Sequence, residues 1–314
     1  MISLEDVIRT SSRALVVGVG GGGDVVGALG TARFLEFCGL EFVLGGLSWE
    51  RSEVDPLPGP RAAQEVMNVR ILHQYAWLAN ASSRTVAGAV FCESRIAGIR
   101  GEDVLLVDIN GGVRGVVDAL RTAMAECKAD LLVGVDVGGD SLAKGVEPGL
   151  YSPLADSIML AAYAELEALG CRTLWGVFGY GSDGEMTNAE IERALSEIAA
   201  GGGLLGAWGL TGRVVAELTA IVQSVPTEAS AIPLRCARGE WGETKIRRGQ
   251  RGVRLTPLAT ITFFLSPVVV FNTVSTLAQT VRRSTSLDEA NEALHSIGIE
   301  TELDRERREY AHDT

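Results

Sequence analysis

The sequence predicts an α/β protein with a doubly wound, mostly parallel sheet and helices on both faces, in the three layers of a Rossmann-like fold. Two observations favour this fold class. Apolar, strand-like runs alternate with stretches of helical periodicity along most of the 314 residues, which is typical of parallel strands joined by crossover helices. The apolar run at 13–19 also leads into consecutive glycines followed by Asp24, as in the first unit of such a sheet.

The expected elements follow from these two periodicities. Short apolar runs predict strands at 13–19, 40–45, 85–92, 103–109, 130–136, 172–179 and 258–265. Apolar residues at helical spacing predict helices at 24–37, 61–79, 113–127, 153–169, 187–199, 211–223, 267–283 and 287–296. Ser152 and Ser266 each precede a proline, and a serine cap with proline at the first helical position marks a helix start. The uncharged stretch 255–281 contains prolines and many hydroxyl groups, which predict a buried strand and helix rather than a membrane span.

The chain shows no internal repeat and no clear boundary, so we expect a single α/β domain over 1–300. Residues 51–60 are expected to form a proline-rich loop, and 201–203 a flexible joint between two helices. Residues 235–254 carry seven basic and two acidic side chains and predict a basic, hairpin-like insertion with its turn at 247–252. The charged tail, 301–314, is expected to be a solvated helix or disordered.

Composition excludes several classes of function. The net charge of −12 argues against a nucleic-acid binder, which needs a basic surface. The five cysteines are scattered and form no Cys-x-x-Cys pair, which argues against a disulfide framework or a zinc site and favours a reducing, cytoplasmic compartment. The acidic residues Glu5 and Asp6 do not suit a signal peptide. His73, on the expected helix 61–79, is interpreted as a packing residue. A homo-oligomer is compatible with all of this.

Aspartates follow the ends of the expected strands, where open parallel sheets form their ligand crevice. Crowded carboxylates repel one another, and a hard cation such as Mg²⁺ or Mn²⁺ relieves that repulsion. We therefore expect a shared site, with metal ligands Asp24, Asp108, Asp136 and Asp140, and with Asp140 and Asp183 as catalytic residues, Asp183 being the base. The alternative is that these Asp and Gly residues are only turn formers. Asp156, in the first turn of the helix at 153–169, is explained equally well by the helix dipole.

The glycine loop predicts an anion site, because bare backbone amides can approach a ligand closely. The expected substrate-binding residues are Gly20, Gly21, Gly22, Gly23, Ser141, Ser152, Arg247 and Arg248. The spacing Gly18-x-Gly20-x-x-Gly23 fits the dinucleotide fingerprint, but Gly45 and Gly46 stand where its acidic residue is expected. NAD is therefore less expected than a phosphate or sugar-phosphate group. The alternatives are that the loop only packs tightly, and that the basic hairpin is solvated or a subunit contact.

Three motifs carry a resemblance to a known family: Gly20-Gly-Gly-Gly-Asp24, Asp136-Val-Gly-Gly-Asp140 and Tyr151-Ser-Pro-Leu-Ala-Asp156. Together they resemble the family called domain of unknown function 1152, found largely in archaea, over most of the chain. The resemblance implies a fold but no activity. More distantly, an α/β sheet with aspartates at its strand ends looks like the metal-dependent damage-control phosphatases. Those proteins carry an adjacent Asp-Asn pair, whereas here Ile109 separates Asp108 from Asn110.

These observations predict a metal-dependent enzyme that acts on a phosphorylated or otherwise anionic small metabolite, by phosphoester hydrolysis or phosphoryl transfer. A second interpretation is a non-catalytic nucleotide-binding or regulatory protein that uses the glycine loop without a metal. A third is a Rossmann oxidoreductase, which would retain a cofactor on purification. A chelator separates the first two, because only the metal-dependent protein should lose ligand binding when EDTA is added.

Overall fold

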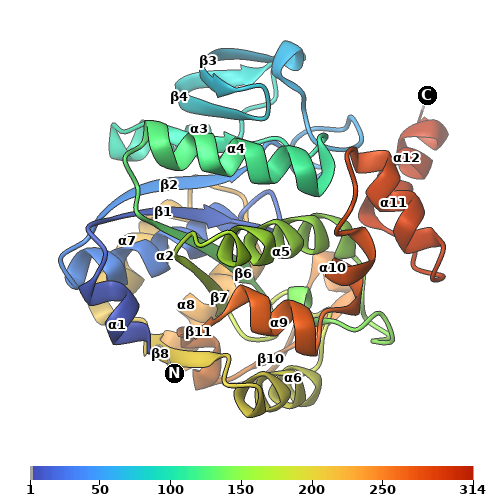
Figure 1. Ribbon diagram of the computed structural model, residues 1–314. Helices are drawn as coiled ribbons and strands as arrows, with labels where there is room; N and C mark the ends of the chain where they lie inside the picture. The colour runs from blue at the N-terminus through green and yellow to red at the C-terminus, as the bar shows by residue number, and fades with distance from the viewer. Residues whose placement is uncertain (1–2, 314) are drawn as a thin grey trace.

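The computed structural model describes residues 3–313 and confirms the α/β fold class (Figure 1). Within these residues, nine strands form one sheet in the order β3-β4-β5-β2-β1-β6-β7-β11-β8. They are β1 (Arg13–Gly18), β2 (Glu41–Leu47), β3 (Val66–His73), β4 (Ala76–Thr85), β5 (Val104–Val107), β6 (Leu131–Val137), β7 (Thr173–Phe178), β8 (Leu204–Gly209) and β11 (Ile261–Leu265).

The five central strands, from β5 through β2, β1 and β6 to β7, pair in parallel, and the outer strands pair antiparallel. From β1 the chain adds β2 and β5 on one side, and later adds β6 and β7 on the other. The junction of β1 and β6 is therefore a topological switch point, where Val16 pairs with Val133. Ligands of open parallel sheets bind outside the carboxyl ends of the strands at such a point.

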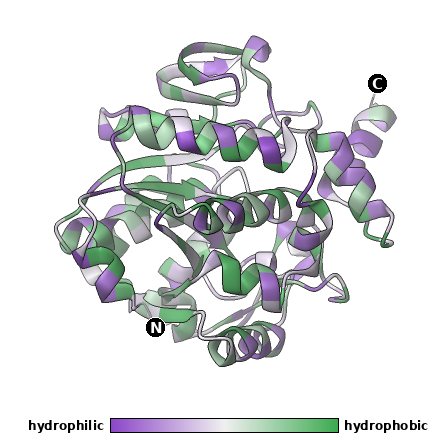
Figure 2. Ribbon diagram, viewed as in Figure 1, coloured by the Kyte–Doolittle hydropathy of each residue, from purple (hydrophilic) through white to green (hydrophobic). Residues whose placement is uncertain are grey.

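Helices cover both faces of the sheet, and each face buries its own apolar cluster. Along β1, Leu15 and Val17 join one cluster while Ala14 and Val16 join the other, because successive side chains of a strand point to opposite faces. The first cluster includes α4 (Gly112–Glu126), α5 (Pro153–Ala168), α6 (Asn188–Ala200), α9 (Pro267–Thr273), α10 (Thr276–Val281) and α11 (Leu287–His295). The second includes α1 (Leu4–Arg9), α2 (Asp24–Phe37), α3 (Cys92–Arg100) and α7 (Gly212–Ile221). Figure 2 shows the central strands as mostly hydrophobic.

The predictions for 61–79 and 85–92 are wrong. Residues 61–79 are not a helix: they form β3 and the start of β4, an antiparallel pair at the edge of the sheet, and His73 ends β3. Of 85–92, Thr85 ends β4, 86–91 form a turn and irregular structure, and Cys92 begins α3. The apolar side chains of β3 are spaced in a way that fits a helix as well as an edge strand. Pairing with β4 decides between the two structures, and the local sequence pattern carries no information about that pairing.

The prediction that 201–203 joins two helices is wrong, and the helix predicted at 267–283 is correct in type but differs in detail. Residues 201–203 lead from α6 into β8, an antiparallel strand that the sequence patterns missed. The expected helix at 267–283 is broken into α9 and α10 at Val274 and Ser275. In the stretch 255–281, as in the rest of the described residues, no helix is long and apolar enough to cross a membrane.

The basic insertion is a hairpin, as predicted. Strands β9 (Gly242–Ile246) and β10 (Arg251–Leu255) pair antiparallel and pack on α8 (Ile232–Ala237). The charged tail forms α12 (Glu302–Asp313), and Thr314 lies outside the described residues. Most of α12 is polar (Figure 2), but Thr301, Glu302 and Leu303 are buried. The start of this helix is therefore part of the packed structure rather than a solvated appendage.

Candidate functional site

The strand-end aspartates gather at the switch point between β1 and β6. Asp24 begins α2 directly after the glycine loop, Asp136 lies near the end of β6, and Asp140 lies in the short turn that follows it. Asp183 lies in the loop after the neighbouring strand β7. All four are buried.

Two groups of carboxylates meet here. In one group, oxygens of Asp136, Asp140 and Asp156 all lie within 4.8 Å of one another, and in the other the same is true of Asp140, Asp183 and Glu185. Asp140 belongs to both, so the five residues form one continuous cluster, which we call the acidic centre. Asp156 comes from the first turn of α5, which brings a helix on one face of the sheet to the ends of β6 and β7.

Asp136 is held in place by a network of hydrogen bonds. Its Oδ1 accepts from the amide of Gly139 at 3.0 Å, and its Oδ2 accepts from both the amide and the hydroxyl of Ser141. The indole of Trp175 donates to the same hydroxyl at 3.0 Å. The side chain of Ser141, expected to bind substrate, is therefore engaged in orienting Asp136.

Glu185 is the other firmly held carboxylate. Its Oε2 accepts from the amides of Tyr151 and Ser152 at 2.7 and 2.8 Å, and its Oε1 accepts from the Ser152 hydroxyl at 2.5 Å and from Arg251 Nη1 at 2.7 Å. Burial by itself would raise the pKa of Glu185, but Arg251 and these hydrogen bonds lower it. Ser152 contacts the centre through Glu185.

Asp156 and Asp183 lack such partners. Both oxygens of Asp183 and Oδ1 of Asp156 are buried without a hydrogen bond to any residue that the structure describes. Burial, and then the neighbouring carboxylates, raise the pKa values of Asp140, Asp156 and Asp183 well above the ordinary range. Unpaired buried charge is costly unless it is neutralised. Hard oxygen ligands in this number fit a divalent cation such as Mg²⁺.

Gly138 permits this crowding. Its φ of +137° lies in the region that favours glycine. A Cβ at this position would lie 2.3 Å from Cγ of Asp183. The absence of a side chain at 138 therefore lets β6 and the loop after β7 approach closely enough for Asp183 to face Asp140.

The glycine loop lies beside the acidic centre and is tightly packed. Oδ2 of Asp24 accepts hydrogen bonds from the amides of Gly20 at 3.0 Å and Val137 at 3.4 Å, and burial raises the pKa of Asp24 to about 7. A Cβ at Gly23 would lie 2.2 Å from the side chain of Thr227. The amide of Gly22 donates to the carbonyl of Trp49 at 2.8 Å. Much of this loop thus contacts neighbouring protein groups, which fits the alternative interpretation that its glycines allow tight packing.

Asp108 lies outside both carboxylate groups. Its Oδ1 accepts a hydrogen bond from the amide of Asn110 at 2.8 Å, and burial raises its pKa to about 6. Among charged side chains, Glu65 and Arg61 act on it most strongly. Of the four expected metal ligands, the structure brings Asp136 and Asp140 together, places Asp24 next to them, and leaves Asp108 with other neighbours.

A cavity of about 680 Å³ adjoins the acidic centre. Arg51, Arg247, Arg248 and Arg305 line it together with Gln250, and so do four glutamates, Glu53, Glu302, Glu306 and Glu309. Arg251 lines it as well, and is the residue that binds Glu185. We call this space the arginine cavity. Its arginines come from the loop after β2, from the basic hairpin and from α12.

Tyr151 forms an aromatic wall of the arginine cavity. The guanidinium of Arg251 lies 4.3 Å from the centre of its ring, and that of Arg305 lies 4.1 Å away. Both distances suit cation–π interactions. The sequence patterns did not indicate Arg51 or Arg305, because the first lies in a loop interpreted as a connection and the second in a tail interpreted as solvated, and they marked Tyr151 only as part of a motif.

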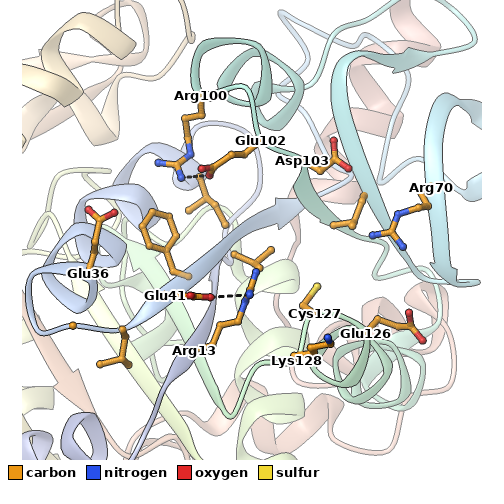
Figure 3. A pocket seen from close by; sticks show the side chains of 16 residues that line it. Arg13, Glu36, Glu41, Arg70, Arg100, Glu102, Asp103, Glu126, Cys127 and Lys128 are labelled. Carbon is orange, nitrogen blue, oxygen red and sulfur yellow. Dashed lines mark hydrogen bonds and ion pairs between the residues drawn. The ribbon is translucent and has the colours of Figure 1, made fainter.

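A larger cavity, of about 880 Å³, lies at the opposite edge of the sheet (Figure 3). Arg13 and Glu41, at the starts of β1 and β2, form an ion pair of 2.9 Å there, and Arg100 pairs with Glu102. Like the walls of the arginine cavity, its walls carry charges of both signs. The amino ends of parallel strands are not where such sheets place their ligands, so the smaller arginine cavity is the better candidate site.

The chain was also compared with known proteins. No curated protein shows a significant sequence match to it. The family model described as "Protein of unknown function (DUF1152)" matches residues 15–310, a span that includes the glycine loop, the acidic centre, the basic hairpin and the start of α12. The chain therefore belongs to the DUF1152 family.

Proposed function

We propose that this protein is a metal-dependent enzyme that acts on a phosphorylated or otherwise anionic small metabolite, by phosphoester hydrolysis or phosphoryl transfer. The observation that carries the proposal is Asp183. It is buried, neither of its oxygens has a hydrogen-bond partner among the described residues, and it faces two further carboxylates, Asp140 and Glu185. A divalent cation satisfies all three at once.

In this proposal the acidic centre holds Mg²⁺ or Mn²⁺. Asp136, Asp140 and Asp156 offer one set of oxygen ligands, and Asp140, Asp183 and Glu185 offer another. Asp24 supports the centre through its hydrogen bond from Val137. Asp108 is left out of the ligand set, because its carboxylate belongs to neither group.

The chain's own residues have distinct roles in the reaction. A cation held there would neutralise charge at the phosphate and would lower the pKa values of a bound water and of Asp183. One oxygen of Asp183 faces Asp140 and Glu185, and its second oxygen, once ionised, would accept the proton of the attacking water or hydroxyl. Asp140 contacts both carboxylate groups and so positions the cation. Arg251 holds Glu185 through an ion pair, and the arginine cavity, which Arg251 also lines, receives the anionic substrate.

Cell compartment is part of the same proposal. All five cysteines are free, which supports a reducing, cytoplasmic setting. The reaction class is also the one implied by the sequence's likeness to damage-control phosphatases, although the Asp108-Ile109-Asn110 spacing departs from their pattern.

The test begins with metal binding. Protein stripped with EDTA is titrated with Mn²⁺ in a calorimeter, and phosphate release from a panel of phosphorylated metabolites is measured with and without the metal. We expect Mn²⁺ to bind the wild type and Asp183→Asn to lose that binding and the metal-dependent turnover. The matched control is Glu93→Gln, because Glu93 is equally buried and unpartnered but lies outside the acidic centre.

Two results would contradict the proposal. One is wild-type protein that binds neither Mn²⁺ nor Mg²⁺. The other is binding that Asp183→Asn leaves unchanged. The rival function, a non-catalytic nucleotide-binding or regulatory protein that uses the glycine loop, predicts nucleotide binding that EDTA does not affect and no turnover.

A further inference from the structure

We propose that the arginine cavity contains a second anion site, formed by Arg51, Arg247 and Arg248, and that the substrate is a small metabolite with two phosphate groups. One phosphate would react at the acidic centre while the other binds these arginines. The substrate class rests on the function proposed above, whereas the anion site itself does not need a metal.

The first support is the lack of internal partners. The side chain of Arg51 makes no hydrogen bond or ion pair with any residue that the structure describes, although it lines the cavity and its charge is favoured by Asp24, Glu185 and Asp140. Arg248 likewise has no partner among the described residues. Guanidinium groups that line a cavity and make no direct hydrogen bond or ion pair to a carboxylate can hold an anion by forked hydrogen bonds.

The second support is the crowding of like charges. Arg247 pairs with Glu228 at 3.6 Å, yet burial, followed by the positive charges of Arg51 and Arg251, lowers its pKa. Since like charges repel each other, the charge of Arg247 is disfavoured beside Arg51 and Arg251 in the absence of a ligand. A bound phosphate offsets that repulsion.

The third support is the backbone of the hairpin turn. Arg247 and Arg248 have φ values of +52° and +53°, a left-handed conformation that costs free energy in residues other than glycine. The amide of Arg247 donates to Glu228 at 2.9 Å, which holds the turn in place. Strain of this kind at consecutive residues is typical of ligand clamps.

The spacing of the two sites sets the substrate class. Arg251 lines the arginine cavity and also forms the 2.7 Å ion pair with Glu185 of the acidic centre, so the two sites share a wall. The cavity volume of about 680 Å³ is in the range of small-molecule sites. In this proposal a doubly phosphorylated sugar or similar metabolite extends from the anion site past Arg251 to the acidic centre, a span that a single phosphate does not cover.

The anion site is tested without metal. Inorganic phosphate is titrated calorimetrically into the EDTA-treated full chain. We expect binding by the wild type, and binding about tenfold weaker in Arg248→Gln, since charge-assisted hydrogen bonds are lost. The matched control is Arg254→Gln, an exposed arginine on the same hairpin that does not line the cavity. Absence of phosphate binding, or equal binding by all three proteins, overturns the anion site.

The substrate class is tested by turnover of a hexose bisphosphate against the matching monophosphate, with Mg²⁺ present. We expect a KM about tenfold lower for the bisphosphate in the wild type, and loss of that preference in Arg248→Gln. Equal KM values with metal-dependent turnover overturn the substrate class but leave the proposed function standing. Metal-free phosphate binding without any metal-dependent turnover has the opposite meaning: the anion site stands and the proposed function fails.

Discussion

Asp183 and Glu185 lie two residues apart in the loop after β7, and their carboxylate oxygens lie within 4.8 Å of each other, but their surroundings are opposite. Glu185 accepts four hydrogen bonds, including one from Arg251. Asp183 accepts none from the described residues. One carboxylate is thus stabilised by the protein alone, while its neighbour is left for a ligand.

This contrast predicts opposite effects on stability at Asp136 and Asp183. Asp183→Asn removes a buried, unpaired charge, so in EDTA the variant should melt no lower than the wild type. Asp136→Asn should melt lower, because an amide group faces the donors of Gly139 and Ser141 with only one acceptor oxygen, at a cost of about 1–3 kcal/mol. Differential scanning fluorimetry measures both. Equal losses in the two variants would mean that Asp183 has a structural partner after all.

Gly138→Ala should weaken cation binding. The new Cβ would lie 2.3 Å from Cγ of Asp183 and push that carboxylate away from Asp140. Gly170→Ala is the matched control, because Gly170 also has a positive φ, of +89°, but its Cβ would meet open space. Both variants should lose stability from backbone strain, Gly138→Ala more than Gly170→Ala because its Cβ also meets Asp183, and only Gly138→Ala should lose Mn²⁺ affinity. Unchanged affinity in Gly138→Ala would show that the centre tolerates displacement of Asp183.

Glu50→Gln should change how stability depends on pH. Burial raises the pKa of Glu50 from 4.5 to about 7, so the unfolded chain ionises this group first. The group's contribution is therefore complete below about pH 4.5 and is lost as the pH rises through 7. Glu50→Gln has no charge to bury and should be more stable than the wild type at pH 8, with the advantage vanishing at low pH. Urea unfolding across this range tests it, and an advantage that grows as the pH falls would contradict the burial argument.

Gly22→Val should disturb both the glycine loop and the arginine cavity. Gly22 has a φ of +52°, and a Cβ there would lie 3.2 Å from Cγ of Arg51. A β-branched residue resists that conformation and displaces Arg51. We expect weaker phosphate binding in EDTA with a lower melting temperature, whereas Gly212→Val, which meets open space, should leave phosphate binding intact. Normal phosphate binding by a folded Gly22→Val protein would remove Arg51 from the anion site.

The sequence was informative where the chemistry follows a strand directly. Asp24, Asp136, Asp140 and Asp183 were found because the carboxyl ends of parallel strands meet at one edge, whatever the length of the connections between them. Asp156 was weighed against the helix dipole, and no local signal separates the two interpretations. The difference is visible only once α5 is seen to begin beside β6.

The remaining parts could not be predicted, because they depend on pairing across the chain. Arg51 lies in a proline-rich loop and Arg305 in a charged tail, and nothing local indicates that both face the same cavity. The strand β3 was mistaken for a helix for a similar reason, since an edge strand with mostly exposed side chains has a weak alternation of polar and apolar residues.

Glu302, in the first turn of α12, joins two segments that lie far apart along the chain, and this contact bears on folding kinetics. Its oxygens accept hydrogen bonds from the amides of Leu154 and Ala155, residues separated from it by 148 and 147 positions along the chain. These amides lie at the start of α5, immediately before Asp156. We expect contacts between such distant segments to form late, because the entropy cost of closing the loop comes before the contact can stabilise the chain. Cation binding should therefore appear only in the slowest phase of refolding, which makes a bound metal a reporter of completed tertiary structure.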